Sequence, residues 1–178
     1  MTFARALILI EISLKNTKKL ELPFLAGLDN NDQPVFESLE LEVLSDRPDH
    51  ARLIKSPVLA RNLAAGDTIK IINPNTAEYE LVARSGNLCI RLFGKDELNN
   101  LEQVLTSAIE KLGGSLDNKT NRALVYSVHI SIGFRKIELL LDEACRDYPE
   151  TVWYYGNVYD PEDGITPLEW WLDFDRLD

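Results

Sequence analysis

Two side chains in the second half of the chain have the chemistry of a nucleophile and its base, Cys89 and His129. A histidine that removes the proton from a cysteine thiol yields a thiolate, the form of sulfur that attacks carbonyl carbons. No sequence typical of an activated cysteine surrounds either residue. The other cysteine, Cys145, completes no CxxC or Cys/His spacing. The sequence therefore predicts no catalytic residue, no metal site and no disulfide.

Glycine-containing and acidic turns are further candidates, because such turns can bind phosphate groups or calcium ions. Gly66-Asp67 and Ser85-Gly86-Asn87 each precede a predicted strand, but neither has the spacing of a GxGxxG loop or of a P-loop. The turn from Asp160 to Gly164 carries three carboxylates without the alternating ligand spacing of an EF-hand loop. We therefore expect no nucleotide, metal or other cofactor.

One face of a predicted sheet is the best candidate for a binding site. Alternate residues of a strand share a face, so the apolar residues of strands 88–93 and 123–131 are expected to contact helices. On the opposite face, Arg91 and His129 would hold an anionic or polar group while Phe93 and aromatic residues of the last strand stack on it. This face carries Cys89, Arg91, Phe93, Val125, Ser127 and His129.

The alternative is that the N-terminal half of the chain packs on this face and buries it. We favour burial, because an uncovered sheet face with Val125 and Phe93 would expose a sticky apolar surface. If the face is instead open, it binds a ligand through a set of polar and aromatic side chains. The ligand-binding candidates are Arg91, His129, Phe93, Ser127 and Cys89.

The elements that would position these residues fall into two groups, and the first consists of short strands. Turn residues such as Asp29-Asn30-Asn31-Asp32 separate the strands. Six closely spaced short strands indicate a small β-barrel or rolled sheet over residues 1–85. Period-two alternation predicts a long hairpin of 6–14 and 20–26, and further strands at 39–43, 51–55, 68–72 and 79–83.

The second group combines helices with strands over residues 86–160. Apolar residues at helical spacing predict helices near 96–112 and 134–148, ended by Gly113-Gly114 and by Pro149. The resulting βαββαβ order is the ferredoxin-like arrangement, so the fold class is α+β. An acidic, aromatic tail over 161–178 follows. The strands of this group are predicted at 88–93, 115–118, 123–131 and 152–159.

The formal net charge of −10 is concentrated in the second half of the chain. Residues 1–85 carry 10 Lys and Arg against 12 Asp and Glu, whereas residues 86–178 carry 9 against 17, so the halves have charges of −2 and −8. Lysine and arginine supply most affinity for phosphate backbones and anionic lipids, so we expect no direct binding to nucleic acid or membranes. A basic protein partner fits this sign.

The acidic C-terminal end is the candidate surface for that partner. Its carboxylates would attract a basic protein over a distance, and a tryptophan would supply buried contact area. The competing interpretation has the tryptophans packed on the protein's own core and the carboxylates merely solvated. The partner-binding candidates are Asp160, Glu162, Asp163, Trp170 and Trp171.

Apolar runs in the sequence bear on where the protein acts. The run from Ala6 to Ile10 is shorter than the roughly 7 to 15 residues of a signal-peptide core. No run approaches the roughly 18 apolar residues of a membrane span. We therefore expect a cytoplasmic protein, and the sequence leaves its oligomeric state open.

Several short motifs resemble a known family. The segments 57–65, Gly66-Asp67-Thr68-Ile69, Arg84-Ser85-Gly86-Asn87-Leu88 and the helix ending in Leu112-Gly113-Gly114 are similar to the bacterial domain of unknown function 4265, over roughly residues 38–159. The resemblance implies a bacterial origin and this domain plan, and it implies no catalytic residues. The last helix and Trp153-Tyr154-Tyr155-Gly156 also resemble the acidic ferredoxin-like regulators of ribonuclease E, which implies binding to a basic protein.

Two hypotheses for function follow. The first is a non-enzymatic acidic protein-binding or regulatory module. The alternative is a small-molecule sensor or an enzyme with a pocket between the two modules. A deep pocket lined by Arg91 and His129 would favour the alternative, whereas a solvent-facing acidic and aromatic patch near the tail would favour the first.

Overall fold

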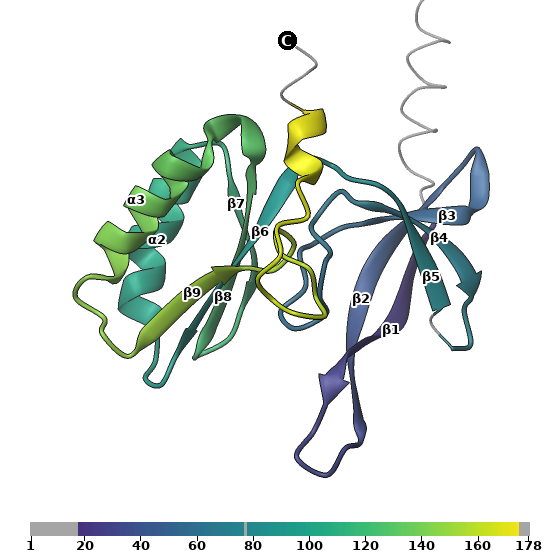
Figure 1. Ribbon diagram of the computed structural model, residues 1–178, viewed down its shortest axis with the longest axis horizontal. Coiled ribbons are helices and arrows are strands. Elements are labelled where there is room, and N and C mark those ends of the chain that lie inside the picture. Colours follow the sequence, from purple (N-terminus) through teal and green to yellow (C-terminus); the bar gives the residue numbers. More distant parts are fainter. Residues whose placement is uncertain (1–17, 77, 175–178) are drawn as a thin grey trace, which may run out of the picture.

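The computed structural model describes residues 18–76 and 78–174 as two antiparallel sheets with two α-helices. Figure 1 shows the two sheets side by side, with both helices on the side of the second sheet that faces away from the first. The coarse α+β prediction is therefore confirmed. The predicted strand at 6–14 lies outside the described residues.

The first sheet is an antiparallel meander in which each strand pairs with the next. The alternation that predicted the strands also sets their register, because Leu20 lies opposite Leu41 and Leu22 lies opposite Leu39. Phe24 is buried in the hydrophobic core of this sheet, and Leu20 and Leu22 pack against that core. The strands are β1 (Lys19–Leu28), β2 (Pro34–Leu44), β3 (Arg47–Leu53), β4 (Thr68–Asn73) and β5 (Glu78–Ala83).

This sheet is open in the part of the chain that the structure describes. Its order runs from β1 to β5, and no pairing joins these two outer strands. The barrel alternative is therefore not confirmed. The long connection between β3 and β4, residues 54–67, leaves the first sheet and runs toward the second (Figure 1). Two of its residues, Ala60 and Leu63, are buried in the hydrophobic core of the first sheet.

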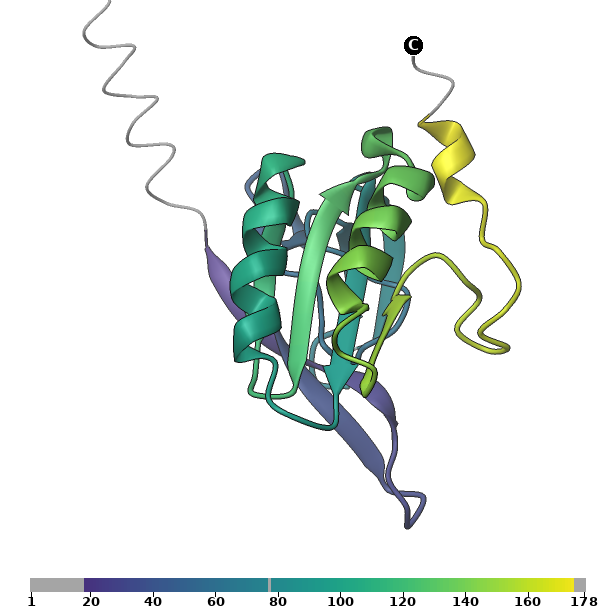
Figure 2. The same ribbon diagram turned by 90° about the vertical axis from the view of Figure 1, so that its left-hand side faces the viewer.

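The second sheet has the strand order β7-β8-β6-β9. Its helix-side face carries a core that includes Leu88 and Ile90 from β6, Leu101 and Leu105 from α2, and Leu141 from α3. Figure 2 shows α2 and α3 lying across this face. The elements are β6 (Asn87–Gly94), α2 (Asn99–Lys111), β7 (Ser115–Lys119), β8 (Ala123–His129), α3 (Phe134–Cys145) and β9 (Thr151–Tyr155).

Several predicted elements end earlier than their apolar patterns suggest. The strand predicted at 123–131 ends at His129 and is followed by a 3-10 helix, Ile130–Ile132. The helix predicted to reach residue 148 ends at Cys145, because the Tyr148 amide donates to the Cys145 carbonyl in a turn before Pro149. The strand predicted to reach residue 159 ends at Tyr155. At Gly156 the backbone passes so close to Arg91 that a Cβ would lie 2.7 Å from the Arg91 Nε.

The C-terminal segment packs on the body of the protein. A short 3-10 helix, η2 (Trp170–Asp173), brings Trp170, Trp171 and Phe174 against the second core. The Trp170 indole Nε1 donates to the Asn157 carbonyl at 2.6 Å, and the Arg84 guanidinium lies 5.4 Å from the Trp170 ring centroid. This segment is therefore part of the fold.

Candidate functional site

The segment 54–67 covers one end of the sheet face that points away from the helices. Arg91, on the central strand β6, is 2% exposed beneath it. Its Nε donates to the Pro57 carbonyl at 3.1 Å and its Nη1 to the Leu59 carbonyl at 3.2 Å, and its Nη2 donates to the Ala60 carbonyl. The guanidinium is therefore occupied by backbone acceptors.

Glu37 of β2 holds the same segment from the other side. Its carboxylate accepts hydrogen bonds from the amides of Val58, Leu59 and Ala60 at 2.7, 2.8 and 2.8 Å. The segment is thus bound through its amides to the first sheet and through its carbonyls to Arg91 of the second. We call Glu37, Arg91 and residues 57–60 the clamp.

A buried polar network continues the contact beside the clamp. Asp117 of β7 accepts from the Ser127 hydroxyl at 2.5 Å and from the Ser56 amide at 2.8 Å. The hydroxyls of Ser56 and Ser127 lie 2.7 Å apart. Because each polar atom has a partner, the network joins the two sheets without leaving a buried group unpaired.

Cys89 and His129 are not brought together as a nucleophile and base. Cys89 is fully buried, its Sγ lies 3.7 Å from the Pro57 carbonyl, and burial raises the pKa of its thiol. The His129 ring is exposed, and its Nδ1 lies 2.8 Å from the Ser131 hydroxyl. A protonated, enclosed thiol is a poor nucleophile.

The structure divides the predicted ligand-binding set between three places. Cys89, Arg91 and Ser127 are buried under the segment 54–67. His129 lies at the far end of β8, with its ring centroid 6.0 Å from that of Phe174. Phe93 is half-buried at the uncovered end of the face. A ligand-binding role for these five residues stays a prediction, and only Arg91 of the set lines the groove described next.

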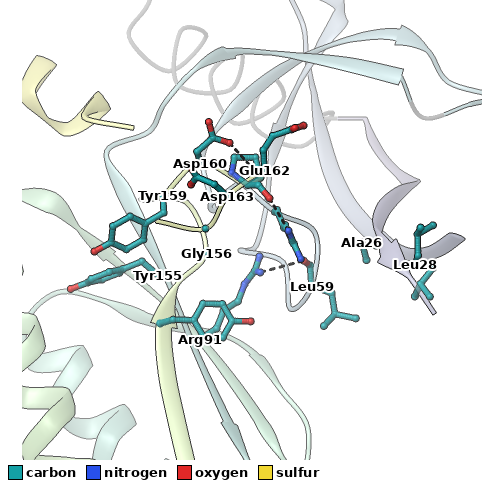
Figure 3. Close-up of a pocket in the computed structure, with 16 residues that line it drawn as sticks. Ala26, Leu28, Leu59, Arg91, Tyr155, Gly156, Tyr159, Asp160, Glu162 and Asp163 are labelled. Atoms are coloured by element: carbon teal, nitrogen blue, oxygen red, sulfur yellow. Dashed lines mark hydrogen bonds between the residues drawn. The ribbon is translucent and has the colours of Figure 1, made fainter. Parts of the chain in front are cut away.

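A groove of about 750 Å³ lies between the two sheets. One wall comes from the β1–β2 hairpin, the other from β9, and the loop at Leu59 lies between them. Figure 3 shows Ala26 and Leu28 on the hairpin side, facing Gly156 and the turn that follows it. The groove therefore brings together residues far apart in the sequence.

The hairpin wall is apolar because the core face of the first sheet continues past its own core. Val35 lies on the same face of β2 as the clamp residue Glu37 and the core residue Leu39. A bulge between Leu25 and Gly27 shifts the register, and Leu28 lies 64% exposed at the end of the strand. Leu28 and Val35 thus form an apolar strip on the hairpin that is partly exposed to solvent.

The β9 wall is aromatic. Tyr154 lies opposite Arg91 on the face away from the helices and is 44% exposed. Its ring stacks on that of Phe93, with centroids 5.9 Å apart and planes inclined by 17°. Val152, 62% exposed, lies on the same face of β9 as Tyr154. This stacking holds Tyr154 in place beside the groove.

An acidic turn closes one end of the groove with Asp160, Glu162 and Asp163. The hydrogen bond from the Thr166 hydroxyl, together with the amides of Thr166 and Ile165, lowers the pKa of Asp163. The predicted partner-binding set is therefore split, since these carboxylates line the groove while Trp170 and Trp171 pack on the second core. A partner-binding role for all five stays a prediction.

The sequence pattern did not predict the hairpin wall of the groove. Leu28 and Val35 flank the polar turn 29–33, where hairpin tips usually carry polar residues. These apolar residues beside a polar turn were the sequence feature that could have indicated the hairpin wall, but the sequence does not show which face of the hairpin lies opposite β9.

Among the described residues, no group of three or more His, Cys, Asp or Glu side chains could hold a metal ion. No helix there is long and apolar enough to cross a membrane.

The model of the family described as "Domain of unknown function (DUF4265)" matches residues 37–149. The chain belongs to this family. The matched residues of this DUF4265 protein include the clamp and the Ser56–Asp117–Ser127 network. They exclude most of the residues that line the groove, among them Leu28, Val35, Tyr154 and the acidic turn.

One solved structure supports the fold of this DUF4265 protein. A crystal structure titled as a hypothetical protein from Neisseria gonorrhoeae is similar with a TM-score of 0.59 and 18% sequence identity, over 79% of this chain and 94% of that one. At this identity the likeness concerns the fold alone. No curated protein matches. These comparisons do not show the likeness to ribonuclease E regulators.

Proposed function

We propose that this DUF4265 protein is a non-enzymatic, acidic protein-binding or regulatory module that holds an extended segment of a partner protein in the groove between its two sheets. The observation that carries the proposal is the exposed apolar strip of the hairpin facing exposed Tyr154. Contiguous apolar surface bordered by polar residues is typical of interaction sites. Aromatic side chains are the usual energetic centres of such interfaces.

The charge around the groove selects the class of partner. Asp160, Glu162 and Asp163 lie at one end, and the two guanidiniums of the lining, those of Arg61 and Arg91, are both engaged with backbone carbonyls. A segment with lysine or arginine beside apolar residues would therefore complement the groove. The carboxylates would speed the encounter, and the apolar walls would supply the buried area.

The alternative is a small-molecule sensor or an enzyme that uses the same space. The volume favours it, since sites for small ligands commonly measure about 300–1,000 Å³. Such sites also need polar groups that converge on the ligand, and each of the three guanidinium nitrogens of Arg91 already donates to a carbonyl of Pro57, Leu59 or Ala60. This second function is therefore the less well supported.

We also propose finer features of architecture and location. The strand order β7-β8-β6-β9, with both helices on one face, supports a ferredoxin-like unit over 86–160. Separate hydrophobic cores support a division from a rolled sheet over 1–85, with 161–178 as a segment packed on the body. The acidic composition supports action on a protein in the cytoplasm and no direct contact with nucleic acid.

The test is selection of random peptides displayed on phage against the full chain. The variant Leu28→Asn removes the apolar contact in the groove. The matched control is Leu25→Asn, because Leu25 is similarly exposed on the same strand but does not line the groove. We expect enriched peptides to combine basic and apolar residues and to bind Leu28→Asn at least about tenfold more weakly than wild type or the control. A failure to enrich peptides, or equal binding to both variants, would contradict the proposal.

A further inference from the structure

The edge of β9 differs from the other outer strands of the described sheets. Natural edge strands are usually protected against pairing by proline, charge or a bulge. β9, with the sequence Thr-Val-Trp-Tyr-Tyr, has none of these. The other edges are protected by Pro23 and a bulge in β1, by Glu78 and Glu80 in β5, and by Asp117, Lys119 and a bulge in β7.

The backbone of β9 presents hydrogen-bonding groups to this edge. The Gly156 amide donates to the Cys89 carbonyl at 2.7 Å. Because antiparallel bonding alternates along a strand, Tyr154 and Val152 direct their amides to β6, while Trp153 and Tyr155 direct theirs outward. No hydrogen bond within the described residues joins the outward amides of Trp153 and Tyr155 to the loops.

We propose that the partner segment binds as an added strand on the outer edge of β9. This inference rests on the proposed function and specifies how the groove is filled. An added strand continues the pleat of β9, so alternate side chains pass onto the face that Tyr154 shares with the groove. These side chains meet the apolar strip of the hairpin.

The other set of side chains falls on the helix side of the sheet, where acidic groups lie next to β9. The Asp142 carboxylate accepts from the Trp153 indole Nε1 at 3.0 Å, and the Glu138 carboxylate lies 3.5 Å from the Tyr155 hydroxyl. Basic residues suit these positions, whereas apolar residues suit the groove side. The two environments therefore specify an extended segment in which basic and apolar residues alternate.

The occupant is a different protein, not a second copy of this chain. The chain has a net charge of −10, and the acidic turn and α3 carboxylates lie on both sides of β9. Pairing of two β9 edges would bring these like charges together, which disfavours the dimer. A basic segment reverses the sign of that interaction.

The experiment uses the full chain, isotopically labelled for NMR, and a short peptide of alternating lysine and valine. We expect hydrogen exchange of the Trp153 and Tyr155 amides to slow by about tenfold or more at saturating peptide, because these amides acquire acceptors. Two further peptides carry backbone N-methyl groups on all lysines or on all valines. An added strand turns only one of these sets of amides toward β9, so one methylated peptide should lose binding and the other should retain it.

The outcomes separate the two proposals. If the peptide leaves the resonances of the groove unchanged, the proposed function fails. If it perturbs Leu28 and Tyr154 but leaves the edge amides unprotected, or if both methylated peptides bind or both fail, strand addition alone is wrong. Protection of the edge amides in a concentration-dependent dimer without peptide would assign the edge to a second copy and overturn the inference.

Discussion

The face of the second sheet that points away from the helices is buried at one end and partly exposed at the other. At one end, Cys89, Arg91 and Ser127 are buried beneath residues 54–67. At the other end, Phe93 and Tyr154 remain partly exposed next to the groove. Both ends belong to the same strands and alternate in the same way, so alternation alone did not decide which was covered. The reach of the segment between β3 and β4 made the difference.

A high content of polar side chains does not mark the binding site on this sheet face. The covered end holds the more polar side chains, yet its hydrogen bonds are satisfied within the chain. Arg91 alone donates to three carbonyls. The uncovered end is apolar and aromatic, and Leu28 faces it across the groove. The part of this face that is still free to contact another molecule is therefore the apolar and aromatic end.

The largest expected effect comes from opening the covered end. Arg91→Ala removes the donor from the backbone carbonyls of Pro57, Leu59 and Ala60, while Glu37 and the Ser56–Asp117–Ser127 network still contact the segment. We expect the free energy of unfolding to fall by about 3–5 kcal/mol. Urea denaturation measures it. The control is Arg61→Ala, which removes one bond to the Pro161 carbonyl from an exposed side chain and should cost less than about 1 kcal/mol. Equal losses would show that the clamp does not hold the face closed.

A smaller loss of stability is expected from the C-terminal segment. Trp170→Ala removes partly buried ring area, the bond to the Asn157 carbonyl and the contact with Arg84. We expect a loss of about 2–3 kcal/mol with peptide binding retained, because Trp170 does not line the groove. Leu172→Ala, at an exposed position of the same 3-10 helix, is the control. Thermal unfolding combined with peptide titration distinguishes the two roles. Unchanged stability with lost binding would make this segment the docking surface.

The uncovered end should respond in the opposite way. Tyr154→Ala removes the aromatic wall, so peptide affinity should fall by about tenfold, or about 1.4 kcal/mol. Stability should change by less than about 1 kcal/mol, since the ring is 44% exposed and loses mainly its stacking on Phe93. Calorimetric titration and denaturation measure the two quantities. A large loss of stability without loss of affinity would make this end structural as well.

The smallest effect concerns the acidic turn. Hydrogen bonds lower the pKa of Asp163 in the folded protein below 3.8, so the unfolded chain binds a proton more readily. The stabilisation is present above pH 3.8 and is lost as the pH falls through the lowered pKa. An NMR titration of the carboxyl should have its midpoint below 3.8. Thr166→Val removes the hydroxyl donor and should move that midpoint upward; an unchanged midpoint would contradict this origin of the shift.

Local pattern predicted most elements of the fold. Apolar spacing located α2 and α3 because a helix buries every third or fourth residue, and alternation located the strands because their side chains point to opposite faces. The same reasoning placed Cys89, Arg91, Phe93 and Ser127 on one face, as the register with β8 and β9 bears out. It could not place Leu28 opposite Tyr154, since no local signal links a hairpin tip to a strand more than a hundred residues later.

The sequence by itself determined the elements and the set of residues on each sheet face, because these depend on neighbours a few positions away. Its composition alone determined the acidic charge. Only the tertiary structure decided which part of the face is buried, since that depends on where residues 57–60 meet both Glu37 and Arg91. It also decided that Trp170 packs on the core and that β9 is an outer strand of its sheet. These outcomes arise from contacts between segments far apart in the sequence. The free energy of such a contact depends on both segments, so neither segment predicts it alone.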